Sequence, residues 1–153
     1  MKRRTFQTLT KKILFCAWLA SGIYFNTLTG STEAEDGPIF RQGMWEFNRT
    51  VENIGSPGKP QTITTKKCTN PTEDMKKQNE MVSKIGCKTS PLVKNGKTYS
   101  FSTECKIQGA IAQSASVITV ENDSAYNINI KSRSDGRGTN ETLQARRTGD
   151  CTK

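Results

Sequence analysis

The cysteines constrain this chain more than any other feature of its sequence. Five are present; Cys16 lies inside an apolar N-terminal run, which leaves Cys68, Cys87, Cys105 and Cys151 for the rest of the chain. An even number of cysteines in an exported chain indicates two disulfides. The alternative is a four-thiolate zinc site, but such sites usually take their ligands in close pairs, and no two of these four are close in sequence. We therefore predict two structural disulfides.

The N-terminal segment has the three parts of a secretory signal. Residues 2–12 are cationic, residues 13–25 are apolar, and a polar stretch ends in small residues at 32–34. The apolar run is shorter than the ~20 residues of a membrane-spanning helix. We predict cleavage after Ala34, so that residues 1–34 are a signal peptide and residues 35–153 form one domain, periplasmic or secreted. An uncleaved anchor is the alternative, and the paired arginines near the start also resemble a twin-arginine signal.

Cleavage would leave the domain only moderately basic and without a stable membrane anchor. It removes five of the 23 basic residues and one of the 14 acidic ones, which lowers the net charge from +9 to +5. The remaining lysines and arginines are spread along the chain and form no cluster of the kind that binds nucleic acid. We therefore predict no nucleic-acid partner.

An Asn-Gly pair at residues 95–96 predicts a β-hairpin and helps to pair the cysteines. With a three-residue loop, Val93 faces Tyr99 and Cys87 faces Cys105, all on one side of the sheet. A two-residue loop would instead place the two cysteines on opposite faces. We therefore predict that Cys87 pairs with Cys105.

The other predicted disulfide joins Cys68 to Cys151, three residues from the C-terminus. It closes more than half of the exported chain into a loop, which contributes roughly 4–5 kcal/mol in the chain-entropy model, against about 3 kcal/mol for the shorter bridge. Only 33% of the residues are hydrophobic. The bridges therefore compensate for a modest core.

The remaining pattern predicts a mainly β (α+β) domain, an antiparallel sheet or partly open barrel of about seven strands with one short helix. In the first strand, over residues 40–51, Trp45, Phe47 and Val51 share a face. Residues 107–120 carry few bulky side chains, so we expect one or two strands there, with a bulge near the middle. Further strands are expected at residues 61–68, on both sides of the Asn-Gly turn, at 125–131 and through 143–145.

One segment has a clear helix start. Asn70 can cap the helix, Pro71 suits its first position, and Glu73 stands where a capping box places a carboxylate. We expect the helix to end before Gly86.

The sequence lacks most catalytic chemistry. It has no histidine, which excludes the usual triads and imidazole bases, and no glycine-rich phosphate loop. We predict no catalytic residue, no metal and no cofactor, and therefore no enzyme. The least implausible alternative is a hydrolase that uses Glu46 and Glu104, provided that the two carboxylates converge.

Three residues are weak candidates for ligand binding. Trp45 could line an apolar pocket, although a tryptophan in a first strand is more often part of the core. Arg146 and Arg147 could bind an anion, but neighbours on a strand point to opposite faces.

The chain resembles a family of small exported bacterial proteins known as domain of unknown function 3617. The resemblance rests on four stretches: Gly43-Met44-Trp45-Glu46, Cys68 through Asp74, the hairpin with Cys87 and Cys105, and Arg146 through Cys151. It implies an exported location and a non-catalytic domain, and it implies no activity. Gln42 departs from the proline that commonly precedes the opening glycine.

These observations favour a non-enzymatic binding or support domain of the cell envelope. Its partner is not identified by the sequence; a small apolar or amphipathic ligand and an envelope protein are both candidates. The alternatives are a carboxylate-dependent hydrolase and an envelope adaptor or inhibitor that acts through a basic surface.

Overall fold

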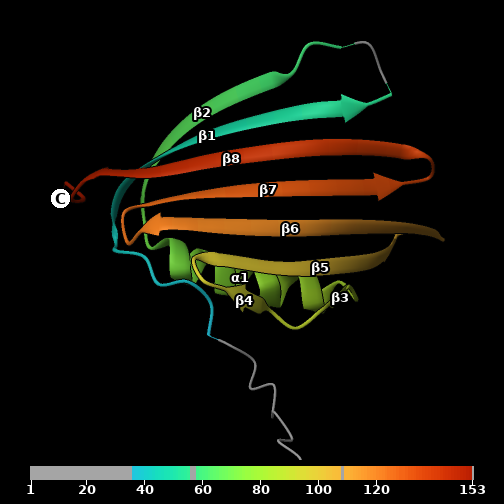
Figure 1. Ribbon diagram of the computed structural model, residues 1–153, viewed down its shortest axis with the longest axis horizontal. Helices are drawn as coiled ribbons and strands as arrows, with labels where there is room; N and C mark the ends of the chain where they lie inside the picture. Colours follow the sequence, from blue (N-terminus) through green and yellow to red (C-terminus); the bar gives the residue numbers. More distant parts are fainter. Residues whose placement is uncertain (1–35, 56–57, 108, 153) are drawn as a thin grey trace, which may run out of the picture. The chain divides into compact units, whose positions relative to one another are not determined.

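The computed structural model describes residues 36–55, 58–107 and 109–152, so the predicted signal peptide at residues 1–34 lies outside the described residues. The described chain forms one antiparallel sheet with a helix behind it (Figure 1). Its elements are β1 (Gly43–Ile54), β2 (Gln61–Thr69), α1 (Pro71–Lys84), β3 (Lys88–Thr89), β4 (Val93–Asn95), β5 (Thr98–Ile107), β6 (Ala110–Asn122), β7 (Ala125–Ser134) and β8 (Arg137–Gly149). In these ranges, no helix is both long enough and apolar enough to cross a bilayer.

The strand order confirms the predicted class and shows that the sheet is open. The eight strands follow the order β2-β1-β8-β7-β6-β5-β3, and β4 also pairs with β5. Strands β5 to β8 form successive hairpins, and β8 then returns to pair with β1. The sheet has one strand more than about seven because the segment before β5 forms two short strands, β3 and β4, instead of one.

The two disulfides join the pairs that the sequence predicts. The Cα atoms of Cys87 and Cys105 lie 4.2 Å apart, and those of Cys68 and Cys151 lie 5.4 Å apart. Because β8 lies beside β1 and β1 beside β2, the residues after β8 reach the end of β2. The late cysteine therefore ties the C-terminus to the second strand.

The predicted hairpin register is wrong near the turn and right near the disulfide. The loop contains only residues 96–97, so Val93 pairs with Ser100 and not with Tyr99. Residues 90–92 interrupt the ladder between β4 and β3, and beyond them β3 pairs with β5 in the predicted register. This interruption absorbs the one-residue difference, so the two cysteines can still meet.

The segment at residues 107–120 also differs from its expectation. The chain reverses at Gly109, where φ is 88°, a left-handed conformation that favours glycine. Strand β6 is then continuous, and its register irregularity lies between Val120 and Asn122, at the end of the strand and not near its middle.

One face of the sheet, which we call the core face, carries the apolar side chains. Trp45 is fully buried, and its Nε1 donates a hydrogen bond to the carbonyl oxygen of Arg41 at 3.0 Å. The ring centroids of Phe40 and Tyr126 lie 4.4 Å apart. Met75 of the helix packs against this cluster. The core face is therefore filled by side chains from the sheet, the helix and the segment before β1.

The helix begins where the sequence predicts. Asn70 Oδ1 accepts a hydrogen bond from the backbone N–H of Thr72 at 3.1 Å, and Pro71 is the first helical residue. The helix ends at Lys84, before Gly86, as expected.

Asp74 ties the helix start to the sheet, whereas Glu73, which stands at the predicted capping-box position, makes no side-chain hydrogen bond to another described residue. The Asp74 carboxylate accepts hydrogen bonds from Lys67 Nζ at 2.6 Å and from Thr69 Oγ1 at 2.7 Å. Burial raises the pKa of Asp74, but these hydrogen bonds and the nearby positive charge outweigh it and leave the pKa below its usual value. Glu73 lies on the exposed side of the helix, 3.6 Å from Lys76 Nζ.

Candidate functional site

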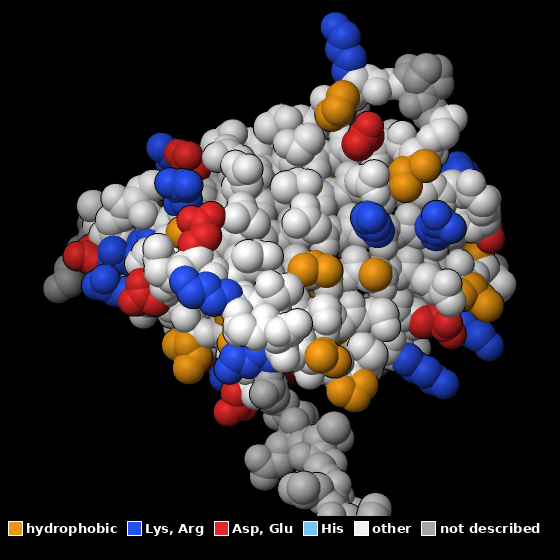
Figure 2. All heavy atoms as spheres, viewed as in Figure 1, with side chains coloured by type: hydrophobic (Ala, Val, Ile, Leu, Met, Phe, Trp, Pro, Cys, Tyr) orange, Lys and Arg blue, Asp and Glu red, His pale blue; other side chains and the backbone are white. Residues whose placement is uncertain are grey.

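The opposite face of the sheet, which we call the open face, is mostly polar and uncharged. Thr64 donates a hydrogen bond to Asn48 Oδ1 at 2.7 Å, and the hydroxyl oxygens of Thr50 and Thr62 lie 2.9 Å apart. Figure 2 shows this face: its centre is mainly white, and Lys and Arg side chains stand on it near the turns on the right of the view. Charged side chains stand at both ends of this face, and those near the turns lie beside two hollows.

Two adjoining hollows of about 660 and 560 Å³ lie at this end and share Gln113 and Arg133. We call them together the cross-strand groove, because their lining follows one row of paired residues across six strands. The row consists of Lys88, Glu104, Gln113, Arg133, Gly138 and Ile54. Antiparallel pairing places successive members of such a row about 5 Å apart on one face.

Small side chains form the floor of the groove. Ala115 lies between Ser102 and Lys131 in the strand register. A Cβ atom added at Gly138 would lie 3.1 Å from Ile54 Cδ1, so the missing side chain allows Ile54 to lie across β8. The groove therefore exists because short residues on the central strands are flanked by long ones.

The groove carries more positive than negative charge. Its basic side chains are Lys88, Lys131, Arg133 and Arg137, and its acidic ones are Glu104 and Asp135. Gln113 Nε2 donates a hydrogen bond to Glu104 Oε2 at 2.9 Å. No ion pair joins any of the four basic groups to a carboxylate within the described residues. Their charges are thus available to an anion.

One half of the groove combines these charges with apolar surface. Ile54 and Ile111 are 46% and 49% exposed, and they line the same hollow as Arg133 and Arg137. The register sets the Arg133 side chain on the same face as both isoleucines, with Lys131 two residues before it on that face. This arrangement fits a molecule that has both an anionic and an apolar part.

The three residues proposed from the sequence lie elsewhere. Trp45 is 0% exposed, so no ligand can contact it without opening the core. Arg147 is held by the chain: its Nε donates to the carbonyl oxygen of Gln42 at 2.9 Å, and its guanidinium pairs with Asp150. Arg146 is exposed on the open face at the end of the sheet away from the groove.

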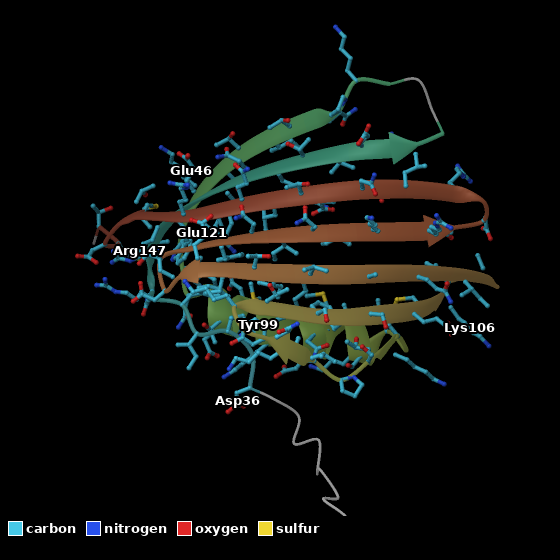
Figure 3. All side chains as sticks on the ribbon, viewed as in Figure 1. Asp36, Glu46, Tyr99, Lys106, Glu121 and Arg147 are labelled. Atoms are coloured by element: carbon cyan, nitrogen blue, oxygen red, sulfur yellow. A yellow bond between two sulfur atoms is a disulfide. The ribbon has the colours of Figure 1, made fainter. Side chains whose placement is uncertain are left out.

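The proposed catalytic carboxylates do not converge. Glu46 lies on β1 and Glu104 on β5, with β8, β7 and β6 between them, a separation of about 19 Å at the usual strand spacing. Figure 3 shows Glu46 at the end of the sheet opposite Lys106, which follows Glu104 by two residues. Glu46 also accepts a hydrogen bond from Lys66, which lowers the pKa of this carboxyl. The hydrolase that uses this pair is therefore excluded.

Two of the stretches that carry the family resemblance pack together at the end away from the groove. Trp45 pairs with Arg147 in the β1–β8 ladder. A Cβ atom at Gly43 would lie 2.5 Å from the carbonyl oxygen of Gly149 and 2.8 Å from Arg147 Cζ. These motif residues therefore hold β1, β8 and the C-terminus together and do not line the groove.

Sequence reasoning missed the groove because its residues come from strands that are distant in sequence. The one available signal was local: Lys131 falls on the polar side of the predicted strand at residues 125–131. Nothing in the sequence placed Lys88 or Ile54 beside it. Among the described residues, no three acidic or cysteine side chains come together as a metal site requires.

Comparison with known proteins gives one match. A family model described as a protein of unknown function, DUF3617, matches residues 40–151. No curated protein and no solved structure matches the chain. The matched range begins at the core residue Phe40, ends at Cys151 and includes every strand of the sheet.

Proposed function

The chain belongs to the DUF3617 family, whose function is unknown, and from this premise we propose that it is an exported, non-enzymatic binding domain of the cell envelope. Its ligand is an amphipathic anion held in the cross-strand groove. The observation that carries this proposal is the hollow in which Arg133 lies beside the exposed Ile54 and Ile111. The two disulfides support export, because such bonds persist in oxidising compartments.

A purely apolar ligand has less support. Around Trp45 the core face is occupied by its own side chains, with Trp45 fully buried and Phe40 and Tyr126 in ring contact. The open face has hydrophobic side chains beside charged ones, and there an apolar molecule would leave the arginines without a partner. The proposal therefore combines two predictions from the sequence. One is that the ligand is amphipathic, and the other is that the protein binds through a basic surface.

The chemistry of the groove suggests a moderate affinity. A phosphate or carboxylate head can accept hydrogen bonds from the Arg133 guanidinium, each contributing about 1.5–3 kcal/mol. An alkyl chain on the two isoleucines adds ~25 cal/mol for each Å² of apolar surface that is covered. Because the groove is open, part of the alkyl chain stays in water, which limits the contribution of its apolar surface to the binding free energy.

The test is a titration of the ¹⁵N-labelled exported domain with dodecyl phosphate below its micelle concentration, followed by NMR. We expect saturable shifts at residues 111–115 and 133–138, and weaker binding at higher salt. Inorganic phosphate should bind more weakly at the same amides, and dodecanol should not bind. Saturable binding of dodecanol alone would contradict the proposal.

Variants separate the two parts of the site. Arg133→Gln should weaken binding of both phosphates about tenfold or more, because one charged hydrogen bond is lost. Ile111→Ser should weaken dodecyl phosphate and leave inorganic phosphate unchanged. Arg146→Gln, on the same face but outside the groove, is the matched control. If Arg146→Gln and Arg133→Gln lost affinity for the phosphates equally, the anion would not bind specifically in the groove.

A further inference from the structure

The two edges of the sheet differ in how they are protected. At one edge, β3 and β4 have two and three residues, and residues 90–92 with Pro91 interrupt them. Short strands and prolines are common ways to prevent a sheet edge from pairing with another chain. At the other edge, β2 runs for nine residues without a proline.

Strand β2 is exposed along its whole free edge. Every residue from Gln61 to Cys68 is exposed, and β1 is its only neighbour in the strand order of the described sheet. One side of its backbone therefore has no strand partner for its N–H and C=O groups. Ile63, an apolar residue, is 58% exposed there.

The lysines on β2 do not protect this edge. Edge lysines usually prevent pairing by charge repulsion. Here Lys66 Nζ lies 2.9 Å from Glu46 Oε2, and Lys67 Nζ lies 2.6 Å from Asp74 Oδ2. Both charges are compensated within the same chain, so a second β2 strand would meet a nearly neutral edge.

We propose that β2 pairs antiparallel with β2 of a second copy of this chain, joining two sheets edge to edge. The Cys68–Cys151 disulfide occupies one end of β2, which leaves residues 61–67 free, with Thr64 at their centre. A two-fold axis through Thr64 sets Lys66 opposite Thr62, so that no two lysines face each other. This interaction is independent of the function proposed for the groove.

The same register also improves contacts between side chains. It sets Ile63 opposite Thr65 of the second copy, and β-branched pairs of this kind are favourable across strands. The two Ile63 side chains become diagonal neighbours, which covers an apolar residue that is exposed in a single copy. The pairing is thus self-complementary in shape, charge and hydrogen bonding, as a two-fold interface requires.

The test is sedimentation velocity of the disulfide-bonded exported chain from low micromolar to near-millimolar concentration. We expect a reversible dimer. Thr64→Lys and Thr64→Glu should each weaken it at least about tenfold, because like charges then face each other across the axis. Mixing the two variants should restore association through a Lys–Glu pair. Val93→Lys, on the protected edge, is the matched control and should dimerise normally.

Three outcomes would overturn the proposal. The first is a monomer at every concentration. The second is a dimer that Val93→Lys disrupts and Thr64→Lys does not. The third is a loss of association in both Thr64 variants that mixing does not reverse although both variants are folded. A native circular dichroism spectrum in each variant checks folding directly.

Discussion

Replacing Gly43 by alanine should destabilise the protein more than any other substitution of one glycine in the described strands. Gly43 is buried, and an added methyl group there would lie 2.5 Å from the carbonyl oxygen of Gly149 and 2.8 Å from Arg147 Cζ. The arginine could move aside only by losing its hydrogen bond to the Gln42 carbonyl oxygen. The Gly149 oxygen belongs to the backbone of β8 and cannot move alone.

These contacts set the size of the effect. Overpacking of a well-packed site costs about 1–3 kcal/mol. Loss of a hydrogen bond from a charged group adds about 1.5–3 kcal/mol. The arginine and the carbonyl oxygen will share the displacement, so we expect a loss of about 3 kcal/mol in the free energy of unfolding. Against a typical total of about 5–15 kcal/mol, this is a large fraction.

The assay is equilibrium unfolding in urea with both disulfides intact, followed by the fluorescence of Trp45. The unfolding midpoint should fall while the slope with urea stays unchanged. Gly149→Ala is the matched control, because a methyl group there meets no atom within 4 Å, and its effect should stay within about 0.5 kcal/mol. Arg147→Ala should reduce the effect of Gly43→Ala, because one of the two obstacles to the added methyl group is then gone.

An unfolding midpoint of Gly43→Ala equal to that of the parent protein would refute this prediction. The prediction would also be refuted if Gly149→Ala lost as much stability as Gly43→Ala. In either case, the close packing at this end of the sheet would not limit the size of residue 43.

Two further predictions concern the disulfides and acid stability. Replacing Cys68 and Cys151 together by alanine should lower the free energy of unfolding by roughly 4–5 kcal/mol, and replacing Cys87 and Cys105 together should lower it by about 3 kcal/mol. The difference arises because the bridges span 83 and 18 residues of sequence. A larger loss for the shorter bridge in urea unfolding would contradict this prediction. Because the pKa of Asp74 is lowered by folding, its contribution to stability is present above the ordinary value of 3.8 and is lost as the pH falls through the lowered value. Asp74→Asn should therefore lose less stability than the parent between neutral pH and about pH 3, and an identical loss in both would count against this role.

Local chemistry explains why much of the fold could be predicted. The helix start depends on Asn70 and Pro71, which act within one turn, and the structure has both in the predicted roles. The pairing of Cys87 with Cys105 follows from a hairpin that closes over a short distance in sequence. Even there, the prediction reached the right pair through a wrong loop. Pro91 marks the interruption at residues 90–92, but a single proline does not determine how many residues leave the ladder.

The candidate binding residues show the opposite case. Residue type suggests Trp45, Arg146 and Arg147 as ligand contacts, but Trp45 is buried and Arg147 is bonded to the backbone of Gln42. Both properties depend on neighbours that are distant in sequence. A residue type indicates what a side chain can do, whereas its availability depends on packing.

By itself, the sequence determined the class of fold, the two disulfide pairs, the helix start and the lack of histidine chemistry. Most of these properties depend on composition or on contacts between residues that are near in sequence. The long disulfide follows because only Cys68 and Cys151 remain once the short one is paired. Only the tertiary structure decided that β8 lies beside β1, that Trp45 is covered by its neighbours, and that Arg133, Ile54 and Ile111 share one hollow. Strand order brings together residues from both halves of the chain, and strand order depends on the packing of the whole sheet.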